Sequence, residues 1–198
     1  MSVLYAARAL TPDGWKSNVR VTIEDGAIAA VQTGAPAQEG DERHAIMAPA
    51  ASSLHSHAFQ RAMAGLAEVR GNETDTFWTW RETMYRFALM MSPDDVEAVA
   101  AQLYVEMLEA GFAAVAEFHY LHNAPDGSPY AEPAEMAARI LAAARRAGIG
   151  VTLLPVFYAH STFGGAPPKP EQRRFITDLK SFARLLDDSH RLIKGPIT

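Results

Sequence analysis

The 198-residue sequence contains no cysteine, which excludes disulfide bonds and cysteine-based metal sites. It also lacks an apolar run of the roughly 18 residues that would indicate a membrane-spanning helix. Positive charge is not in excess, because the formal net charge is -5, and a nucleic-acid partner is therefore not expected. Any metal site in this chain must use histidine, aspartate or glutamate.

Two further features are missing. The amino-terminal residues lack the charged and apolar regions of a secretory signal peptide, so we expect a cytoplasmic protein that does not contact membranes. No glycine-rich loop follows any expected strand, which counts against a nucleotide-binding sheet. Hydrophobic residues make up 48% and charged residues 21% of the chain, a balance typical of globular proteins.

Two histidines, His55 and His57, stand two positions apart in a short expected strand, residues 53–57. Alternate residues of a strand share one face, so both imidazoles can reach the same metal ion. Imidazole nitrogen suits zinc, and a catalytic zinc site keeps one position open for water. Two solvated or packed histidines beside a turn are the ordinary alternative, so this pair alone is weak evidence for a metal site.

The apolar pattern changes near residue 49. Residues 3–48 contain four short strand-like runs separated by turn signals such as Asp25-Gly26, which predicts a small β unit. From residue 53 onward strands alternate with helices, which predicts a parallel sheet covered by helices. The expected strands there are 53–57, 112–118 and 151–158, and the expected helices are 76–90, 92–110, 133–147 and 171–186.

An open doubly wound sheet and a (β/α)8 barrel both satisfy this alternation. A barrel carries its active site at the carboxyl ends of its strands. The histidine pair, His119-Tyr120 and His160 all lie at or just beyond such ends. We therefore expect an α/β fold in which residues 1–48 belong to a small β-sandwich unit and residues 49–198 form the first part of a (β/α)8 metal-dependent hydrolase barrel.

Several longer motifs resemble those of the amidohydrolase superfamily and, within it, of the formimidoylglutamate deiminase family. They are Leu54–Gly65, Phe77–Glu82, Ala116–His122, Tyr158–Gly165 and Gln172–Phe175. The resemblance covers about residues 3–176. Each motif alone is unspecific, but their combination is highly specific.

This resemblance implies the hydrolysis of N-formimino-L-glutamate to N-formyl-L-glutamate and ammonia, a step of histidine degradation. It implies that His55 and His57 bind one zinc ion per chain and that Gln60, Arg81 and Tyr120 hold the small-molecule substrate. Zinc lowers the pKa of a bound water toward 7, and a guanidinium fork matches the carboxylates of this substrate. The resemblance also implies a homodimer.

Other polar residues near the motifs have ordinary structural explanations. Glu117 lies inside an apolar strand, where a structural hydrogen bond is a better explanation than catalysis. His119, His122 and His160 are expected to support the fold or the site rather than to bind metal. Arg81 as surface cover and Gln60 as a helix cap are the alternatives to substrate contact.

The other metal-binding and acid–base residues that the family needs have no counterpart before Thr198, so we expect no catalytic residue within this chain. Three or so strands cannot close an eight-stranded barrel. The chain is therefore either part of a longer enzyme or a truncated, inactive barrel fragment. A different amidohydrolase, resembling guanine deaminase, is the second enzymatic alternative.

Overall fold

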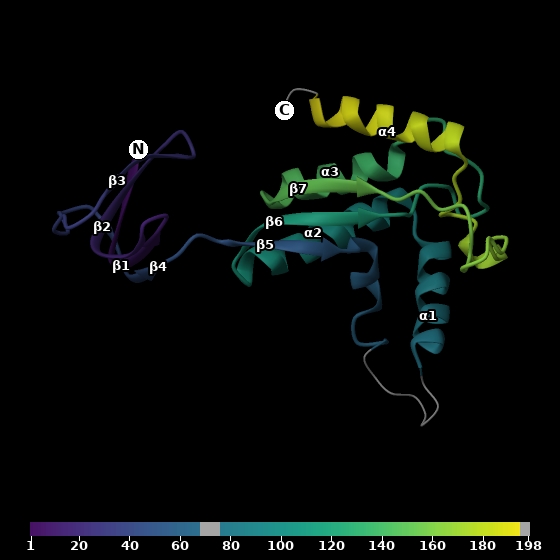
Figure 1. The fold of residues 1–198 in the computed structure, drawn as a ribbon, viewed down its shortest axis with the longest axis horizontal. Coiled ribbons are helices and arrows are strands. Elements are labelled where there is room, and N and C mark those ends of the chain that lie inside the picture. The colour runs from purple at the N-terminus through teal and green to yellow at the C-terminus, as the bar shows by residue number, and fades with distance from the viewer. Residues whose placement is uncertain (68–75, 195–198) are drawn as a thin grey trace. The chain divides into compact units, whose positions relative to one another are not determined.

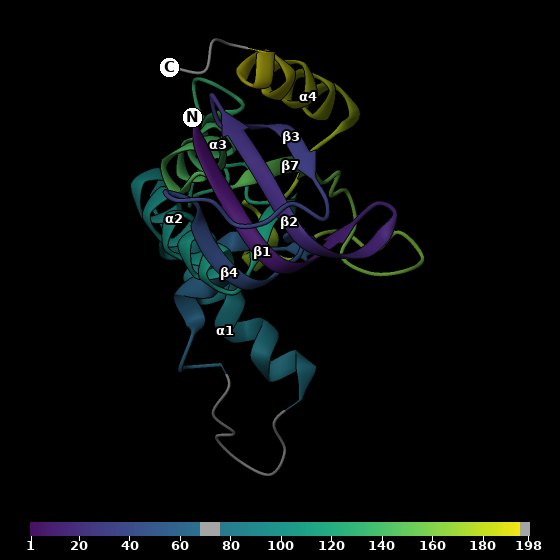
Figure 2. The same cartoon turned by 90° about the vertical axis from the view of Figure 1, so that its left-hand side faces the viewer.

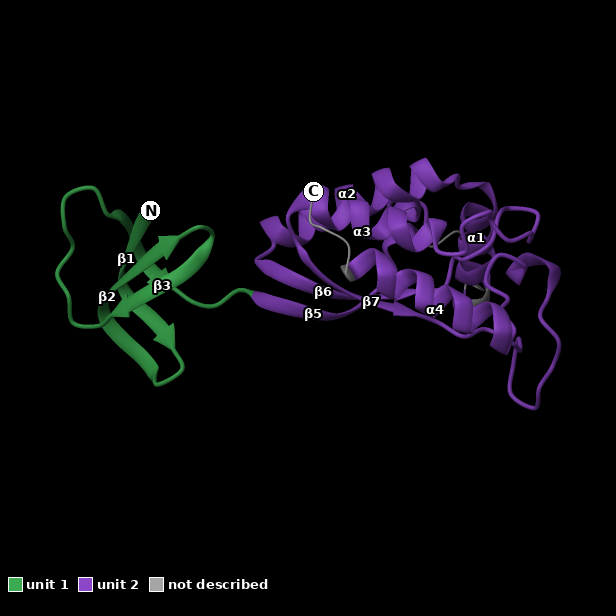
Figure 3. Cartoon of the chain, turned by 90° about the horizontal axis from the view of Figure 1, so that it is seen from above, with its two compact units in different colours: residues 1–50 green, residues 51–198 purple. Residues whose placement is uncertain are grey.

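The computed structural model describes residues 1–67 and 76–194, apart from the side chains of residues 78 and 194. It contains two compact units, residues 1–50 and residues 51–198, which are coloured separately in Figure 3. A four-stranded sheet builds the first unit, and a three-stranded sheet with helices builds the second.

The first unit is a single mixed sheet with the strand order β3-β2-β1-β4 (Figure 2). Its strands are β1 (Ser2–Thr11), β2 (Gly14–Glu24), β3 (Ala27–Gln32) and β4 (Glu42–Met47). The pairs β1–β2 and β2–β3 are antiparallel, and β4 runs parallel to β1. Its small buried core consists of Ala6, Ala9, Val19 and Val21.

The tight turn between β2 and β3 follows from two residues. Asp25 and Gly26 both have positive φ, 50° and 76°. A two-residue hairpin of the type that matches strand twist needs positive φ at both positions, and Asp-Gly tolerates this conformation well. The predicted hairpin at this position is confirmed.

The second unit is built on three parallel strands in the order β5-β6-β7 (Figure 1). The strands are β5 (Ala51–Ser56), β6 (Phe112–His119) and β7 (Gly150–Pro155). The helices are η1 (Ala58–Met63), α1 (Phe77–Met90), α2 (Pro93–Glu109), α3 (Glu135–Ala147), η2 (Pro170–Gln172) and α4 (Leu179–Lys194). The predicted parallel sheet with helices, and hence the α/β class, is confirmed.

The two faces of the sheet differ in what covers them. Along β6, Val115, Glu117 and His119 are buried on the face that α2 and α3 cover (Figure 3). On the opposite face Phe118 of β6 pairs in register with Leu154 of β7, and these side chains are 39% and 37% exposed. The main core of this unit therefore lies between the sheet and the helices.

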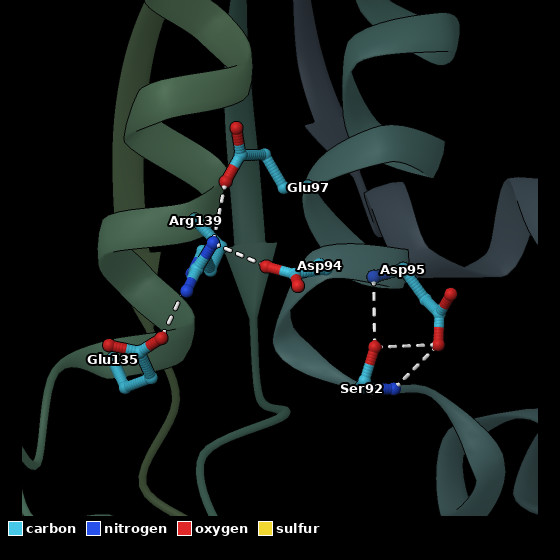
Figure 4. A network of polar contacts seen from close by, with 6 residues as sticks. All are labelled: Ser92, Asp94, Asp95, Glu97, Glu135 and Arg139. Atoms are coloured by element: carbon cyan, nitrogen blue, oxygen red, sulfur yellow. Dashed lines mark hydrogen bonds and ion pairs between the residues drawn. The ribbon is translucent and has the colours of Figure 1, made fainter.

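Helix α2 begins near the start of the predicted helix 92–110, with Ser92 as its N-terminal cap. The Ser92 hydroxyl accepts a hydrogen bond from the Asp95 backbone N–H, and the Asp95 carboxylate accepts one from the Ser92 backbone N–H (Figure 4). This reciprocal pair satisfies two N–H groups that no helical carbonyl can reach.

A charged network joins α2 to α3. Arg139 of α3 donates to Glu135 one turn earlier, and to Asp94 and Glu97 of α2 (Figure 4). The three nitrogen–oxygen distances lie between 2.7 and 3.0 Å. Because one guanidinium serves three carboxylates on two helices, it holds the register between these helices as well as adding electrostatic stability.

The predicted helix over residues 171–186 is wrong. The structure has the short η2, a non-helical segment and then α4, which begins at Leu179. The reason is tertiary: Arg174 is fully buried and donates to the backbone carbonyls of Ala88, Met91 and Asn123. Asp178 then accepts a hydrogen bond from the Ser181 N–H, which is the pattern of a helix cap.

The predicted strand 151–158 is also too long, because β7 ends at Pro155. Of the residues that follow β7, Val156 and Tyr158 line the cavity described below. Among the helices that the structure describes, none combines the length and the apolar character needed to cross a membrane.

Candidate functional site

The histidine pair lies at the carboxyl end of β5. His55 is the second-to-last residue of β5, and His57 directly precedes the 3-10 helix η1. Their Nε2 atoms are 3.0 Å apart, and their rings meet edge to face. The structure therefore brings the two imidazoles to one point, as the spacing of two residues predicts.

One backbone contact determines which nitrogen of His57 carries its proton. Nδ1 of His57 lies 2.8 Å from the carbonyl oxygen of Phe118, and a carbonyl can only accept. Burial lowers the pKa of His57, because burial penalises the charged imidazolium. In the neutral ring with Nδ1 protonated, Nε2 has a lone pair directed toward His55. In metal-binding histidines, the ring nitrogen that does not bind the metal usually donates its N–H to a carbonyl or carboxylate in this way.

The pair fits one part of a zinc site. Two nitrogens that each lie about 2.0–2.1 Å from a tetrahedral zinc are about 3.3 Å apart, close to the observed 3.0 Å. Zinc sites normally use three or four protein ligands. Within residues 1–67 and 76–194, no cluster of three histidine, aspartate or glutamate side chains is suited to a metal. Two nitrogens at this separation could supply two of the ligands that such a site requires.

A buried carboxylate supports the segment that follows the pair. Glu117 is 1% exposed and accepts hydrogen bonds from the Ala58 backbone N–H at 2.7 Å and the Tyr104 hydroxyl at 3.2 Å. Burial raises the pKa of Glu117, and these two hydrogen bonds oppose the shift. Through its hydrogen bond to the Ala58 N–H, Glu117 of β6 fixes the position of the first residue of η1, which directly follows His57. This contact has the structural character that the sequence predicts.

Beside the pair lies a cavity of about 370 Å³ at the carboxyl ends of the strands. It brings together His57, Gln60, Arg81 and Tyr120, four of the five residues that the sequence singles out. The fifth, His55, contacts His57. The remaining lining residues are Phe77, Trp80, Met84, Tyr85, Phe118, Val156, Tyr158 and Phe175.

The polar groups of the cavity are linked in pairs. Nε2 of Gln60 donates to the Tyr120 hydroxyl at 2.7 Å, and Nη2 of Arg81 donates to the Tyr158 hydroxyl at 3.3 Å. Arg81 also lies over the ring of Tyr85, 5.4 Å from its centroid. Burial raises the pKa of Tyr120, so its hydroxyl stays protonated. The cavity combines apolar walls with hydroxyl and guanidinium donors, which suits an anionic ligand.

Three polar residues of this region are not among those predicted from the sequence. Tyr85 and Tyr158 line the cavity, and Gln172 lies behind them with 1% exposure. Tyr158 and Gln172 lie in two of the motifs that resemble the deiminase family, and this position is the one feature of the sequence that points to them. Their importance depends on contacts across 14 and 87 residues of sequence, which no local pattern reveals.

The other histidines of the strand ends lie outside this cavity's lining. His119 and His122 are both 3% exposed, and their rings meet edge to face with centroids 5.3 Å apart. Nε2 of His122 lies 2.9 Å from the Val156 carbonyl. Burial lowers the pKa of His122 to about 4, so the ring is neutral at pH 7. His160 is exposed.

Comparison with known proteins shows two matches in sequence. Residues 1–45 match the family model of the formimidoylglutamate deiminase HutF N-terminal domain. Over 187 residues the chain is 54% identical to the formimidoylglutamate deiminase of Pseudomonas aeruginosa. This alignment covers 94% of the chain but only 41% of that relative, so the chain spans about two fifths of its length.

Solved structures give the same result. An amidohydrolase from Brucella melitensis superposes with a TM-score of 0.92 and 55% identity, covering 98% of this chain and 44% of that one. An adenosine deaminase from Xanthomonas campestris superposes with a TM-score of 0.64 over 98% of this chain and 40% of that one. Its identity is only 15%, so this second likeness concerns the fold alone.

The matches confirm the resemblance that the motifs predict. They also agree with a chain that is shorter than its relatives. In sequence and in fold, this chain is similar to the part of formimidoylglutamate deiminase, an amidohydrolase, that includes its N-terminal domain.

Proposed function

We propose that this chain is part of a zinc-dependent formimidoylglutamate deiminase, which hydrolyses N-formimino-L-glutamate to N-formyl-L-glutamate and ammonia in histidine degradation. The observation that carries the proposal is the cavity in which His57 meets Gln60, Arg81 and Tyr120. The 54% identity to a deiminase of that name supports the same substrate.

In this proposal the side chains of the cavity bind the substrate by complementary charge. N-formimino-L-glutamate has two carboxylates, and the Arg81 guanidinium offers a planar fork of N–H donors to one of them. The hydroxyl of Tyr120, which accepts from Gln60, directs its proton elsewhere and can donate it to the substrate. The apolar walls exclude water and strengthen these contacts.

We propose that His55 and His57 hold the zinc ion together with ligands from outside this chain. When bound, zinc supplies a water of lowered pKa and polarises the bond to be hydrolysed. The solved structures of the adenosine deaminase from Xanthomonas campestris and of an atrazine chlorohydrolase from Arthrobacter aurescens contain zinc, which supports this choice of metal. The contact from His57 to the Phe118 carbonyl keeps its ring in the orientation that metal binding needs.

We also propose that β5, β6 and β7 are the first three strands of a (β/α)8 barrel, and that β1–β4 belong to a small β-sandwich. The parallel order of the three strands supports the barrel. So do Phe118 and Leu154, which are partly exposed on the face away from the helices, where a barrel interior would lie. As an enzyme of metabolism it would be a cytoplasmic homodimer, a proposal that the family resemblance supports.

The first test combines activity with metal content in the protein as its gene encodes it. We expect ammonia release from N-formimino-L-glutamate and none from guanine, with about one zinc per chain by elemental analysis. Removing zinc with a chelator should abolish activity, and adding zinc should restore it. Metal-free protein with undiminished activity would contradict the role of zinc.

A double variant, His55→Ala with His57→Ala, separates metal binding from activity. We expect its zinc content to fall to near zero, because two of the ligands are gone. The control is His44→Ala, whose histidine lies in the first unit. Full zinc content in the double variant would show that the metal binds elsewhere.

A further inference from the structure

Gln172 is a buried polar side chain next to the cavity whose amide is hydrogen-bonded at both its oxygen and its nitrogen. It is 1% exposed, and its carbonyl oxygen Oε1 accepts from the Lys169 backbone N–H at 2.8 Å. Its amide nitrogen Nε2 lies 2.8 Å from the hydroxyl of Tyr85 and 2.8 Å from that of Tyr158. Both tyrosines line the cavity, whereas Gln172 does not.

The backbone contact determines which way the amide faces. A backbone N–H can only donate, so the atom of Gln172 that faces Lys169 must be the oxygen. The NH2 group must then face the two tyrosines, and it has one hydrogen for each of them. Both phenol oxygens therefore accept a hydrogen bond from Gln172.

The two hydroxyl protons must consequently point away from Gln172. The Tyr158 oxygen accepts a second hydrogen bond, from Nη2 of Arg81 at 3.3 Å. Of the two protons, at most one can be shared between Tyr85 and Tyr158, so the pair keeps at least one proton that a ligand in the cavity can accept. Next to Arg81, this end of the cavity therefore presents donors.

We propose that Gln172 is a positioning residue that makes the Tyr85–Tyr158 pair a hydrogen-bond donor to a substrate carboxylate held beside Arg81. The inference rests on the proposed function, since it takes the substrate to be a dicarboxylate. A carboxylate has only acceptor atoms and satisfies these donors. A carboxamide in its place would offer only one acceptor oxygen and turn its NH2 group toward the other donors, so the pair would select an acid over an amide.

The test compares three substrates: N-formimino-L-glutamate and its two mono-amides, in which one carboxylate is a carboxamide. In wild-type protein, KM should be lower for the diacid than for at least one amide. Gln172→Glu keeps the shape of the side chain but replaces the NH2 group by an acceptor, which draws both tyrosine protons toward itself. We expect its preference for the diacid to fall by about tenfold or more, chiefly through KM.

A second variant distinguishes orientation from packing. Gln172→Met removes the hydrogen bonds without adding an acceptor, so its preference for the diacid should lie between those of the wild type and Gln172→Glu. If Gln172 served packing alone, both variants would weaken all three substrates equally. That outcome would overturn the inference. Tyr130→Phe is the control, because the Tyr130 hydroxyl accepts from Arg174 and lies outside the lining of this cavity.

If Gln172→Glu does not fold, the double variant Tyr85→Phe with Tyr158→Phe removes both protons without burying a charge. It should lose the same preference for the diacid, and an unchanged preference would overturn the inference. A wild-type protein that releases no ammonia from N-formimino-L-glutamate would contradict the proposed function instead. The inference is then decided by calorimetric binding of glutarate and of its mono-amide, where wild type should prefer glutarate and Gln172→Glu should not.

Discussion

At the scale of single residues, the second unit places hydrogen-bond donors at one end of a cavity and a pair of imidazoles beside it. Arg81, Tyr120 and Tyr158 reach the cavity from a helix, a strand end and a loop. The partly buried guanidinium is therefore the residue whose removal should separate charged from neutral substrates.

Replacing Arg81 with alanine should raise KM for N-formimino-L-glutamate by about tenfold to a hundredfold, because a charge-assisted hydrogen bond is lost. A neutral formimino amide should be affected much less. Steady-state kinetics on both substrates measures the difference. The control is Arg86→Ala, an exposed arginine of the same helix that does not line the cavity. Equal increases in KM for both substrates would remove the carboxylate role of Arg81.

At the scale of elements, local sequence determines where some helices begin, whereas tertiary contacts determine others. Helix α2 forms near the range that the sequence predicts, and Ser92 and Asp95 cap it without help from distant residues. The predicted helix at 171–186 was wrong because Arg174 bonds to the carbonyl that directly follows α1 and to one in the loop after β6. These carbonyls lie 51 and 83 residues away in sequence, so no local pattern could indicate them.

The cap gives a prediction for α2. Ser92→Ala should lower the free energy of unfolding by about 1 kcal/mol, because the N–H group of Asp95 loses its acceptor. Ser92→Gly should lower the free energy of unfolding by only a few tenths of a kcal/mol, since glycine leaves the N–H groups of the helix end open to water. Urea denaturation of both variants measures this. Equal losses for alanine and glycine would show that the hydroxyl does not cap α2.

At the scale of the whole molecule, the buried histidines link stability to pH. His122 has a pKa of about 4 in the folded chain, whereas an exposed histidine has its ordinary value near 6.5. Folding therefore favours the neutral ring. The resulting stability is fully present above pH 6.5 and is lost as the pH falls toward 4. Its size is about 3 kcal/mol.

His122→Gln should flatten this dependence, since glutamine does not titrate yet can still donate to the Val156 carbonyl. Denaturation midpoints between pH 7 and pH 4 provide the measurement. His190→Gln, a change at an exposed histidine of α4, should keep the wild-type slope. A wild-type slope in His122→Gln as well would assign the acid sensitivity to other groups.

The sequence by itself determined the α/β class, the parallel sheet, the hairpin at Asp25-Gly26 and the likeness to the deiminase family. These depend on local periodicity, turn geometry and short motifs, which are properties of short segments and do not require tertiary contacts. The proposed roles of His55, His57, Gln60, Arg81 and Tyr120 were drawn from the motifs as well. Only the tertiary structure brought four of these five residues around one cavity.

Only the tertiary structure, too, decided the orientation of the Gln172 amide, the bonds of Arg174 and the burial of His122. The amide orientation follows from the nearby Lys169 N–H, but the two tyrosines it meets, the partners of Arg174 and the burial of His122 depend on groups that are distant in sequence. A buried polar group must find a partner, and the fold determines which partner is within reach. This is the physical reason why the donor character of the cavity could not be read from the motifs alone.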